Sequence, residues 1–386
     1  MSQLILNGTA LEIFGLQCLI TCCISRNVPI YFFIHRFAMA IILNEYLMEL
    51  LAIHDEIEEA MPRRRLKDVS NPLEAYSEPQ FVQRYRFSKD VFLHKILPLI
   101  GRIPHYSNRG RPLPHMLCVT TALRFYATGS FQQVVGDVHG VSQSYICQAV
   151  NHVSKELSRH LKTFIQLPKP EEIDRLKKEF YKIGGFPHVT ALIDGTHIPI
   201  QNPSRQNGEI FRNRKGFFSL NVQVVCGPDM KIFDIVCRWP GRAHDSRIFN
   251  GSAVKQKYAN KEVEGLILGD SGYGQTPYLY TPLDKPVTRP EKRYQRAQLK
   301  TRNLIERTFG VWKRRFPCLS KKMNYKLINT NHIIVACAVL HKIGIKYNFV
   351  DFDEPIQDPI VPLVNVRPTA RGSAVKKAFI TRFFDY

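Results

Sequence analysis

Several motifs that identify common enzyme classes are missing from this sequence of 386 residues. Its nine cysteines form no CxxC pair and have no histidines at zinc-site spacing, which argues against structural zinc and fits reduced thiols in an intracellular compartment. No GxSxG turn is present to carry the serine of a hydrolase triad. The glycines of GDSGYG, residues 269–274, match neither a dinucleotide-binding loop nor a phosphate loop, so no small-molecule cofactor is predicted.

The sequence also lacks an unbroken apolar stretch near its start. Asn7, Glu12 and Gln17 interrupt the apolar residues 4–24, and no small-residue cleavage site follows, so neither a membrane span nor a signal peptide is favoured. From Met39 onward the pattern is that of a separate amphipathic helix with acidic residues in its later turns. We therefore interpret residues 1–38 as an apolar extension outside the domains.

Acidic residues are few compared with basic ones. The chain has 33 Asp and Glu against 54 Lys and Arg, which gives a formal net charge of +21. Such an excess attracts a polyanion, and we expect a nucleic acid to be the partner. The alternative is that the charge only keeps the protein soluble. A short basic run, Pro62–Lys67, is either a nuclear-import signal or a solvated linker.

Residues 39–165 are predicted to be a helical module. Within it, two helical runs are separated by a turn at Gly140, and Ser142 is the N-cap candidate of the second run. This arrangement is typical of a helix-turn-helix, whose second helix lies in the major groove of DNA. Gln143 and Gln148 would then face the bases. A helical hairpin in an ordinary bundle has the same pattern, so both interpretations remain open.

After His188 the hydrophobic period changes from that of helices to that of strands. Strand candidates lie at 188–195, 217–226, 232–239, 264–270 and 279–283. The first three are predicted to be antiparallel, and helices are expected at about 300–315 and 331–346. The fold class is therefore α/β, with a mixed sheet and flanking helices. Residues 351–386 begin acidic and proline-rich, and we expect them to form a poorly packed tail.

Four acids stand in motif-like settings within this core: Asp194, Asp245, Asp270 and Glu306. Asp194 and Asp270 each close an apolar strand, where open α/β sheets place ligand-binding groups. Mg²⁺ and Mn²⁺ prefer carboxylate oxygens, and a two-metal site stabilises both the attacking and the leaving oxygen of a displacement at phosphorus. The acids therefore predict a metal-dependent phosphodiester site.

Each acid also has an ordinary structural interpretation. Asp194 and Asp270 precede turn-forming residues and could simply start turns. Asp245 could cap a helix or pair with a nearby arginine. Glu306 could form an i,i+4 ion pair with Arg302, but such a pair contributes only about 0.2–0.5 kcal/mol. The repetition of a strand-ending Asp on two strands favours the functional interpretation.

Six motifs, in their order and spacing, carry a more specific signal. They are ALRFYATGSFQQVVGD (residues 122–137), ALIDGTHIPI (191–200), PGRAHDSRIF (240–249), LILGDSGYG (266–274), KTRNLIERTFGVWKRRFPCL (300–319) and ACAVLHKI (336–343). Together they resemble the motifs of PIF/Harbinger-type transposases, specifically those of the Harbinger transposase-derived nucleases. One departure is Lys342, which stands where an Asn usually follows the His.

The resemblance implies a ribonuclease-H-like DDE nuclease domain over residues 186–346, preceded by the helical module. Asp194, Asp270 and Glu306 would be its catalytic, metal-binding acids, and Asp245 would be an additional ligand to a divalent cation, Mg²⁺ or Mn²⁺. Family members of this kind are nuclear, so we expect the nucleus, with the cytoplasm as a second compartment. A separate Myb-like DNA-binding protein is the expected partner.

We therefore predict a metal-dependent DNA endonuclease, derived from or acting as a transposase, that hydrolyses phosphodiester bonds. Lys313, Arg314 and Arg315 are expected to neutralise the DNA backbone and to make binding sensitive to salt. The alternative is a domesticated, non-catalytic DNA-binding or adaptor protein with a fossil nuclease core. The intact set of acids favours the enzyme.

Overall fold

The structure is a computed structural model that describes residues 43, 45–50, 71–101, 114–204, 206, 208–347 and 370–385. The chain divides into two units, Met1–Leu66 and Lys67–Tyr386. In the first unit the described residues are helical and exposed, in line with the helix predicted from Met39. Residues 1–38 and the basic run Pro62–Lys67 lie outside the described residues. The sheet and the remaining helices belong to the second unit.

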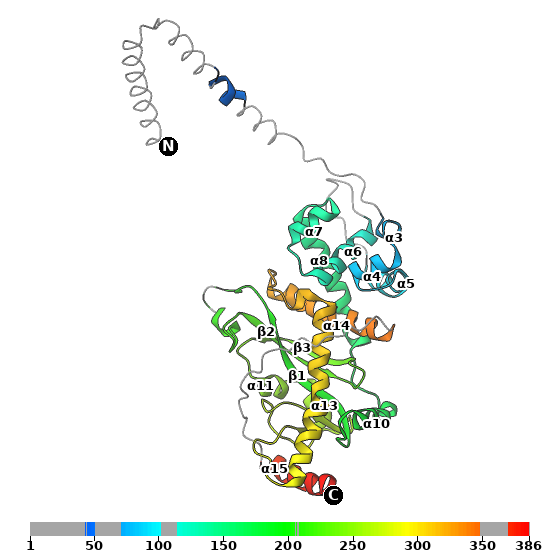
Figure 1. The fold of residues 1–386 in the computed structure, drawn as a ribbon, viewed down its shortest axis with the longest axis vertical. Coiled ribbons are helices and arrows are strands. Elements are labelled where there is room, and N and C mark those ends of the chain that lie inside the picture. Colours follow the sequence, from blue (N-terminus) through cyan, green and yellow to red (C-terminus); the bar gives the residue numbers. More distant parts are fainter. Residues whose placement is uncertain are drawn as a thin grey trace, which may run out of the picture. The chain divides into compact units, whose positions relative to one another are not determined.

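The second unit combines a five-stranded sheet with many helices (Figure 1). The strands are β1 (Val189–Pro199), β2 (Ser219–Cys226), β3 (Ile232–Pro240), β4 (Leu266–Leu268) and β5 (Leu279–Tyr280). The helices are α3 (Pro72–Ala75), α4 (Glu78–Tyr85), α5 (Lys89–Val91), α6 (His115–Thr128), α7 (Gln132–His139), α8 (Gln143–Arg159), α9 (Leu161–Phe164), α10 (Ile173–Gly184), α11 (Asp245–Asn250), α12 (Ala253–Ala259), α13 (Arg289–Arg315), α14 (Leu327–Lys346) and α15 (Ala370–Phe384). Short 3-10 or π-helical turns occupy Phe92–Ile96, Leu97–Leu99, Pro170–Glu172, Gly208–Phe211 and Pro317–Leu319.

The sheet is mixed, with strand order β3-β2-β1-β4-β5. Strands β1, β2 and β3 pair antiparallel, which confirms the prediction for the first three strands. Strands β4 and β5 continue the sheet in parallel from the other side of β1. Because β1 and β4 are parallel neighbours, with Leu192 opposite Leu268, the residues that follow them emerge at the same edge. This edge carries two of the predicted acids.

Alternation along the strands divides the apolar core into two clusters. Leu192 and Val224 belong to the larger cluster, which includes residues of α13 and α14, whereas Ile193 and Val225 belong to a smaller one with residues of α11 and α12. Successive strand side chains point to opposite faces, so helices cover both faces of the sheet. Strand β2 is accordingly buried along its whole length.

Helix α13 is the longest element among the described residues, and it begins eleven residues before the predicted start near 300. Its N-terminus is fixed by a capping box, in which Thr288 Oγ1 accepts from the Glu291 N–H and the Glu291 carboxylate accepts from the Thr288 N–H. Pro290 near the start strengthens the signal. The apolar stripe that includes Ile305 and Trp312 is buried against the core.

Helices α7 and α8 form where two helical runs were predicted. Gly140 ends α7 in the left-handed conformation, with φ of 61°. Ser142 caps α8 by accepting from the Tyr145 N–H at 3.3 Å. The side chains of Gln143 and Gln148 are exposed on α8, whereas Ile146 and Val150 are buried.

Helix α14 is long and apolar enough, by length and composition alone, to cross a membrane. In this structure it is a core helix, because residues such as Ile333, Cys337 and Leu340 are fully buried. Its neighbours include α8 of the helical module, where Ser158 Oγ lies 2.8 Å from Nδ1 of His332. The helical module and the sheet are therefore joined through α14.

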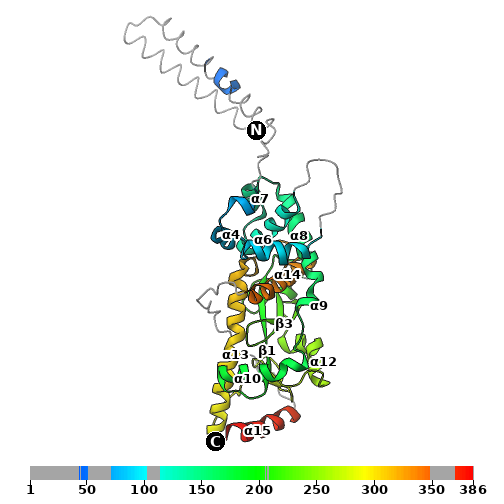
Figure 2. The same ribbon diagram turned by 90° about the vertical axis from the view of Figure 1, so that its right-hand side faces the viewer.

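The prediction of a poorly packed tail is wrong for residues 370–385, which form α15. Figure 2 shows this helix (red) lying across the start of α13. Phe384 is buried, and its ring lies 5.6 Å from those of Phe186 and Tyr294. Lys376 Nζ donates to the carbonyls of Thr281 and Pro282 at 2.7 and 3.0 Å. The acidic, proline-rich start of residues 351–386 led us to miss this helix. Its apolar residues, such as Ile380 and Phe384, are buried only because they pack against distant parts of the chain.

Replacing Phe384 by Ala is expected to lower the free energy of unfolding by about 3 kcal/mol, because it removes a buried aromatic ring and leaves a cavity in its place. Urea denaturation of the whole chain measures this change. Val287→Ala, at a residue that is 74% exposed, serves as the control and is expected to change stability by less than about 0.5 kcal/mol. Equal stability of the two variants would show that α15 does not contribute to the fold.

Candidate active site

Asp194 lies within β1, directly after the buried apolar residues Ala191–Ile193. One carboxylate oxygen, Oδ1, accepts the N–H of Gly195 at 2.8 Å. The other, Oδ2, accepts from Nη1 of Arg302 on α13 at 3.3 Å, and the side chains of both residues are at most 15% exposed. Strand β1 therefore places the carboxylate of Asp194 next to the guanidinium of Arg302, and both groups are largely shielded from solvent.

Asp270 lies two residues beyond β4, at the strand edge shared with β1. Its Oδ1 accepts the N–H of Gly272 at 3.0 Å, the local bond of an Asp-initiated turn. The carbonyl of the preceding residue, Gly269, accepts from Nε2 of Gln298 on α13 at 2.9 Å. The turn-forming interpretation of Asp270 is thus correct, and the turn also directs its carboxylate toward the other acids.

Asp245 is the first residue of α11, directly after the N-cap residue His244, and its Oδ1 accepts from Nδ2 of Asn221 on β2 at 2.9 Å. A Cβ on Gly195 would lie 2.5 Å from Asp245 Oδ1. A Cβ on Gly272 would lie 3.1 Å from Asp270 Oδ1 and 3.5 Å from Asp245 Oδ2. Glycines therefore leave room for Asp245 beside both strand-ending acids.

The charges of these three carboxylates act on one another. Burial raises the pKa of Asp194 well above its usual value, and Asp270 and then Asp245 raise it further against the opposing effect of Arg302. Burial, followed by the charge of Asp245, raises the pKa of Asp270 to about 6. Burial also raises the pKa of Asp245, opposed first by the bond from Asn221. We call these three residues, Asp194, Asp245 and Asp270, the acid cluster. It concentrates negative charge at a half-buried position.

Glu306 stands apart from the acid cluster. Its side chain is 55% exposed, and its Oε1 accepts from Nη2 of Arg302 at 2.6 Å. The predicted i,i+4 ion pair is therefore present, but the same guanidinium also reaches Asp194. Arg302 joins the first and the last of the predicted catalytic acids. Sequence reasoning treated it only as an ion-pair partner, although its position one turn before Glu306 was visible.

A row of polar side chains along α13 meets the ends of three strands. Gln295 Oε1 accepts the N–H of Leu283, beyond β5, at 2.7 Å. Gln298 reaches the carbonyl of Gly269, beyond β4, and Arg302 reaches Asp194 in β1. One helix face therefore holds the strand ends that carry Asp194 and Asp270.

Buried polar atoms without a hydrogen-bond partner also lie beside the acid cluster. Within the described part of the chain they include Asn221 Oδ1, Ser271 Oγ, Tyr273 Oη, Gln298 Oε1 and Arg302 Nε. Buried polar groups are almost always paired in folded proteins, so unpaired ones near a charged centre indicate capacity for a polar ligand. As placed, no three His, Cys, Asp or Glu side chains of the described residues are grouped as metal ligands.

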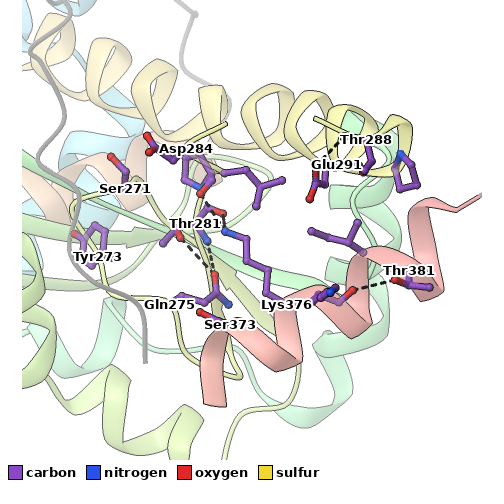
Figure 3. Close-up of a pocket in the computed structure, with 15 residues that line it drawn as sticks. Ser271, Tyr273, Gln275, Thr281, Asp284, Thr288, Glu291, Ser373, Lys376 and Thr381 are labelled. Carbon is purple, nitrogen blue, oxygen red and sulfur yellow. Dashed lines mark hydrogen bonds between the residues drawn. The ribbon is translucent and has the colours of Figure 1, made fainter. Parts of the chain in front are cut away.

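A cavity of about 770 Å³ opens next to the loop that follows Asp270 (Figure 3). Ser271 and Tyr273 line it from that loop, Thr288 and Glu291 from the start of α13, and Lys376 from α15. Burial lowers the pKa of Lys376 to about 8, and its bonds to two carbonyls fix it to the cavity wall. The acids of the cluster are absent from the lining, so this cavity is a neighbour of the candidate site.

The three residues of α13 that were predicted to contact DNA differ in their exposure to solvent. Lys313 and Arg314 are half-buried, with Lys313 Nζ 3.5 Å from the carbonyl of His197 and Arg314 Nε 3.4 Å from that of Gly310. The prediction that Arg315 contacts the DNA backbone is wrong, because this side chain is 1% exposed and donates to the carbonyl of His341 at 3.4 Å. It lies three residues after the buried Trp312, on the same face of the helix.

Comparison with known proteins shows to which family the chain belongs. A family model described as "DDE superfamily endonuclease" matches residues 193–342. The Bos taurus protein named "Putative nuclease HARBI1" is 31% identical over 316 residues, covering 80% of this chain and 88% of that protein. Its Xenopus laevis counterpart is 27% identical over 304 residues, covering 77% and 85%. The Arabidopsis thaliana "Protein ALP1-like" is 27% identical over 253 residues, covering 61% and 62%.

No solved structure matches the chain. The matched region contains every member of the acid cluster together with Arg302 and Glu306, and the mixed α/β architecture is consistent with a DDE nuclease fold. The chain belongs to the Harbinger transposase-derived nucleases of the PIF/Harbinger superfamily.

Proposed function

We propose that this protein is a divalent-metal-dependent DNA endonuclease that hydrolyses phosphodiester bonds. The observation that carries the proposal is the convergence of Asp194, Asp245 and Asp270, from three separate segments, into one half-buried and mutually repelling cluster. Keeping like charges together is unfavourable for folding alone, and such arrangements concentrate at functional sites. The strand order and directions of the sheet further support a ribonuclease-H-like domain.

The side chains fit a divalent cation by their chemistry. Asp194, Asp245 and Asp270, with Glu306, would offer the hard oxygen ligands that Mg²⁺ and Mn²⁺ prefer, and Arg302 would release Asp194 Oδ2 to bind it. When bound, the cation would polarise the scissile phosphate and lower the pKa of an attacking water. Unpaired polar atoms such as Tyr273 Oη add room for polar ligands beside the acids.

The other residues have supporting tasks in this proposal. Asn221 orients Asp245, and Gln298 fixes the turn that carries Asp270. The exposed Gln143 and Gln148 of α8 would approach DNA bases as in a helix-turn-helix, with Lys313 and Arg314 near the backbone. A nuclear location and a Myb-like partner belong to the same proposal, supported by the family motifs.

Nicking of supercoiled plasmid tests the proposal directly. The wild-type chain is expected to nick DNA with Mg²⁺ or Mn²⁺ and to lose this activity in a chelator. Glu306→Gln is expected to reduce nicking by about tenfold, equivalent to about 1.4 kcal/mol, because Glu306 is exposed and would be a more weakly held ligand than the three aspartates. The control is Glu262→Gln, another exposed acid, which is expected to retain full activity.

The outcome also separates the enzyme from its rival. DNA binding without nicking, with either metal and with an added Myb-like partner, would contradict the nuclease proposal and support a non-catalytic DNA-binding or adaptor protein. Nicking that survives a chelator would contradict the role of the metal. Wild-type activity in Glu306→Gln would remove Glu306 from the site without affecting the three aspartates.

A further inference from the structure

Arg214 and His244 meet at the exposed side of the acid cluster. Nη2 of Arg214 lies 2.8 Å from Nδ1 and 3.4 Å from Nε2 of His244, and both residues are exposed. His244 directly precedes Asp245 in the chain. Arg214 is also close enough to Asp245 for its charge to oppose the burial that raises the pKa of Asp245. The pair is thus exposed to solvent and lies next to Asp245 of the acid cluster.

A buried asparagine fixes the turn that carries Arg214. Asn213 is 5% exposed, and its Nδ2 donates to Ser219 Oγ on β2 at 3.0 Å. Its Oδ1 accepts the N–H groups of Lys215 and Phe217 at 2.9 and 3.3 Å. Asn213, the residue before Arg214, therefore anchors the turn to the sheet. This bond limits the backbone conformations that Arg214 can adopt.

A second buried asparagine fixes the segment that carries His244. Asn221 Nδ2 donates both to the carbonyl of Ala243 and to Asp245 Oδ1, each at 2.9 Å. These are the residues on either side of His244. Asn213 and Asn221 thus fix the backbone segments that carry Arg214 and His244, and such pre-organisation reduces the entropy lost on binding.

The charge of Arg214 differs from that of its neighbour Arg212. Arg212 forms a two-pronged ion pair with Glu209, at 2.8 and 3.0 Å, so a carboxylate neutralises it. Arg214 contacts an imidazole, which supplies no negative charge, and it enters no ion pair among the described residues. Of these two arginines in one loop, Arg214 therefore retains the positive charge that an anion would require.

We propose that Arg214 and His244 bind a backbone phosphate of DNA next to the phosphate that is cleaved. The inference rests on the proposed function and extends it by naming the contact that positions the substrate strand at the acid cluster. A guanidinium and an imidazole are both phosphate donors, and phosphate contacts set the register of a nucleic acid on a protein without reading its sequence. Both are held at the exposed side of Asp245, where the strand would enter.

Salt-dependent DNA binding tests this contact without requiring catalysis. Fluorescence anisotropy with a short labelled duplex of random sequence, in chelator and over a series of NaCl concentrations, gives the slope of log affinity against log salt. Arg214→Ala is expected to reduce the magnitude of this slope by about 0.9, the value of one phosphate contact. His244→Ala is expected to weaken binding less, and Arg214→Lys to retain the wild-type slope.

The matched control is Arg212→Ala, which removes an arginine already paired with Glu209 and is expected to leave the slope unchanged. Circular dichroism of each variant checks the fold. A wild-type slope in Arg214→Ala, or equal losses in Arg214→Ala and Arg212→Ala, would overturn the inference while leaving the nuclease proposal standing. Failure of the wild-type chain to bind DNA at all would instead overturn the proposed function.

Discussion

Asp270→Asn is expected to reduce plasmid nicking by about 100- to 10,000-fold, because a carboxylate that holds a catalytic cation contributes several kcal/mol and each 1.36 kcal/mol is tenfold in rate. Asparagine has nearly the same shape and can still accept from the N–H of Gly272, so the turn is retained. A loss of nicking would therefore result from the missing negative charge and not from a changed turn. Single-turnover nicking with enzyme in excess measures it.

The same variant is expected to be more stable than the wild type in the absence of metal. Burial and Asp245 raise the pKa of Asp270 from 3.8 to about 6. The folded state therefore favours the protonated acid, and its contribution to stability is present below pH 3.8 and lost as the pH rises through 6. At pH 7 the ionised side chain costs up to about 3 kcal/mol at 1.36 kcal/mol per pKa unit, and asparagine removes that cost.

The matched control is Asp174→Asn, at a side chain that is 86% exposed, which is expected to change neither nicking nor stability. Urea denaturation at pH 7 gives the free energies of unfolding. A less stable Asp270→Asn protein would show that the carboxylate serves the fold. Retained nicking would remove Asp270 from the catalytic set. The expected combination, lost activity with gained stability, is the signature of a site maintained for function.

His341 is expected to make the protein sensitive to acid. It is fully buried on α14, its Nε2 lies 3.1 Å from the carbonyl of Met230, and burial with the nearby charge of Arg315 lowers its pKa from 6.5 to about 3. The unfolded chain takes up a proton below pH 6.5 whereas the folded chain does not. Stability from this residue is therefore present above pH 6.5 and is lost as the pH falls toward 3, by about 3 kcal/mol at pH 4.

His341→Gln tests this expectation, because glutamine can donate toward Met230 and does not titrate. The free energy of unfolding is measured from pH 7 to pH 4 for both proteins, and their difference cancels the opposing contributions of the acid cluster. The wild type is expected to lose about 3 kcal/mol more than the variant over this range. His94→Gln, at an exposed histidine, is the control. Parallel pH profiles for wild type and His341→Gln would contradict the assignment.

Much of the sheet could be predicted because strand periodicity is local. The alternation in residues 217–226 and the apolar run before Asp194 are visible in the sequence, and both segments are strands. The start of α13 was missed because residues 289–299 are mostly polar, although the capping box of Thr288 and Glu291 marked it. Two of these polar residues, Gln295 and Gln298, bond to a loop and to a strand end, which no helical period reveals.

The candidate site was predictable in its three aspartates and less so in its cations. Strand endings and motif spacing single out Asp194 and Asp270, and the parallel pairing of β1 and β4 brings them to one edge. Arg315 looked like a third exposed cation after Lys313 and Arg314, but each residue turns the helix by about 100°, which directs it inward. The double contact of Arg302 depends on a strand that is distant in sequence.

Three residues on one face of α13 contact Leu283, Gly269 and Asp194. These contacts constrain the number of residues between them along the helix. Deleting one residue between Gln295 and Arg302 would shift the later part of the helix by about 1.5 Å and turn it by about 100° relative to the earlier part. The early bond to the loop beyond β5 and the later contact with Asp194 could then no longer form together. Insertions and deletions in this stretch are therefore far less tolerable than substitutions.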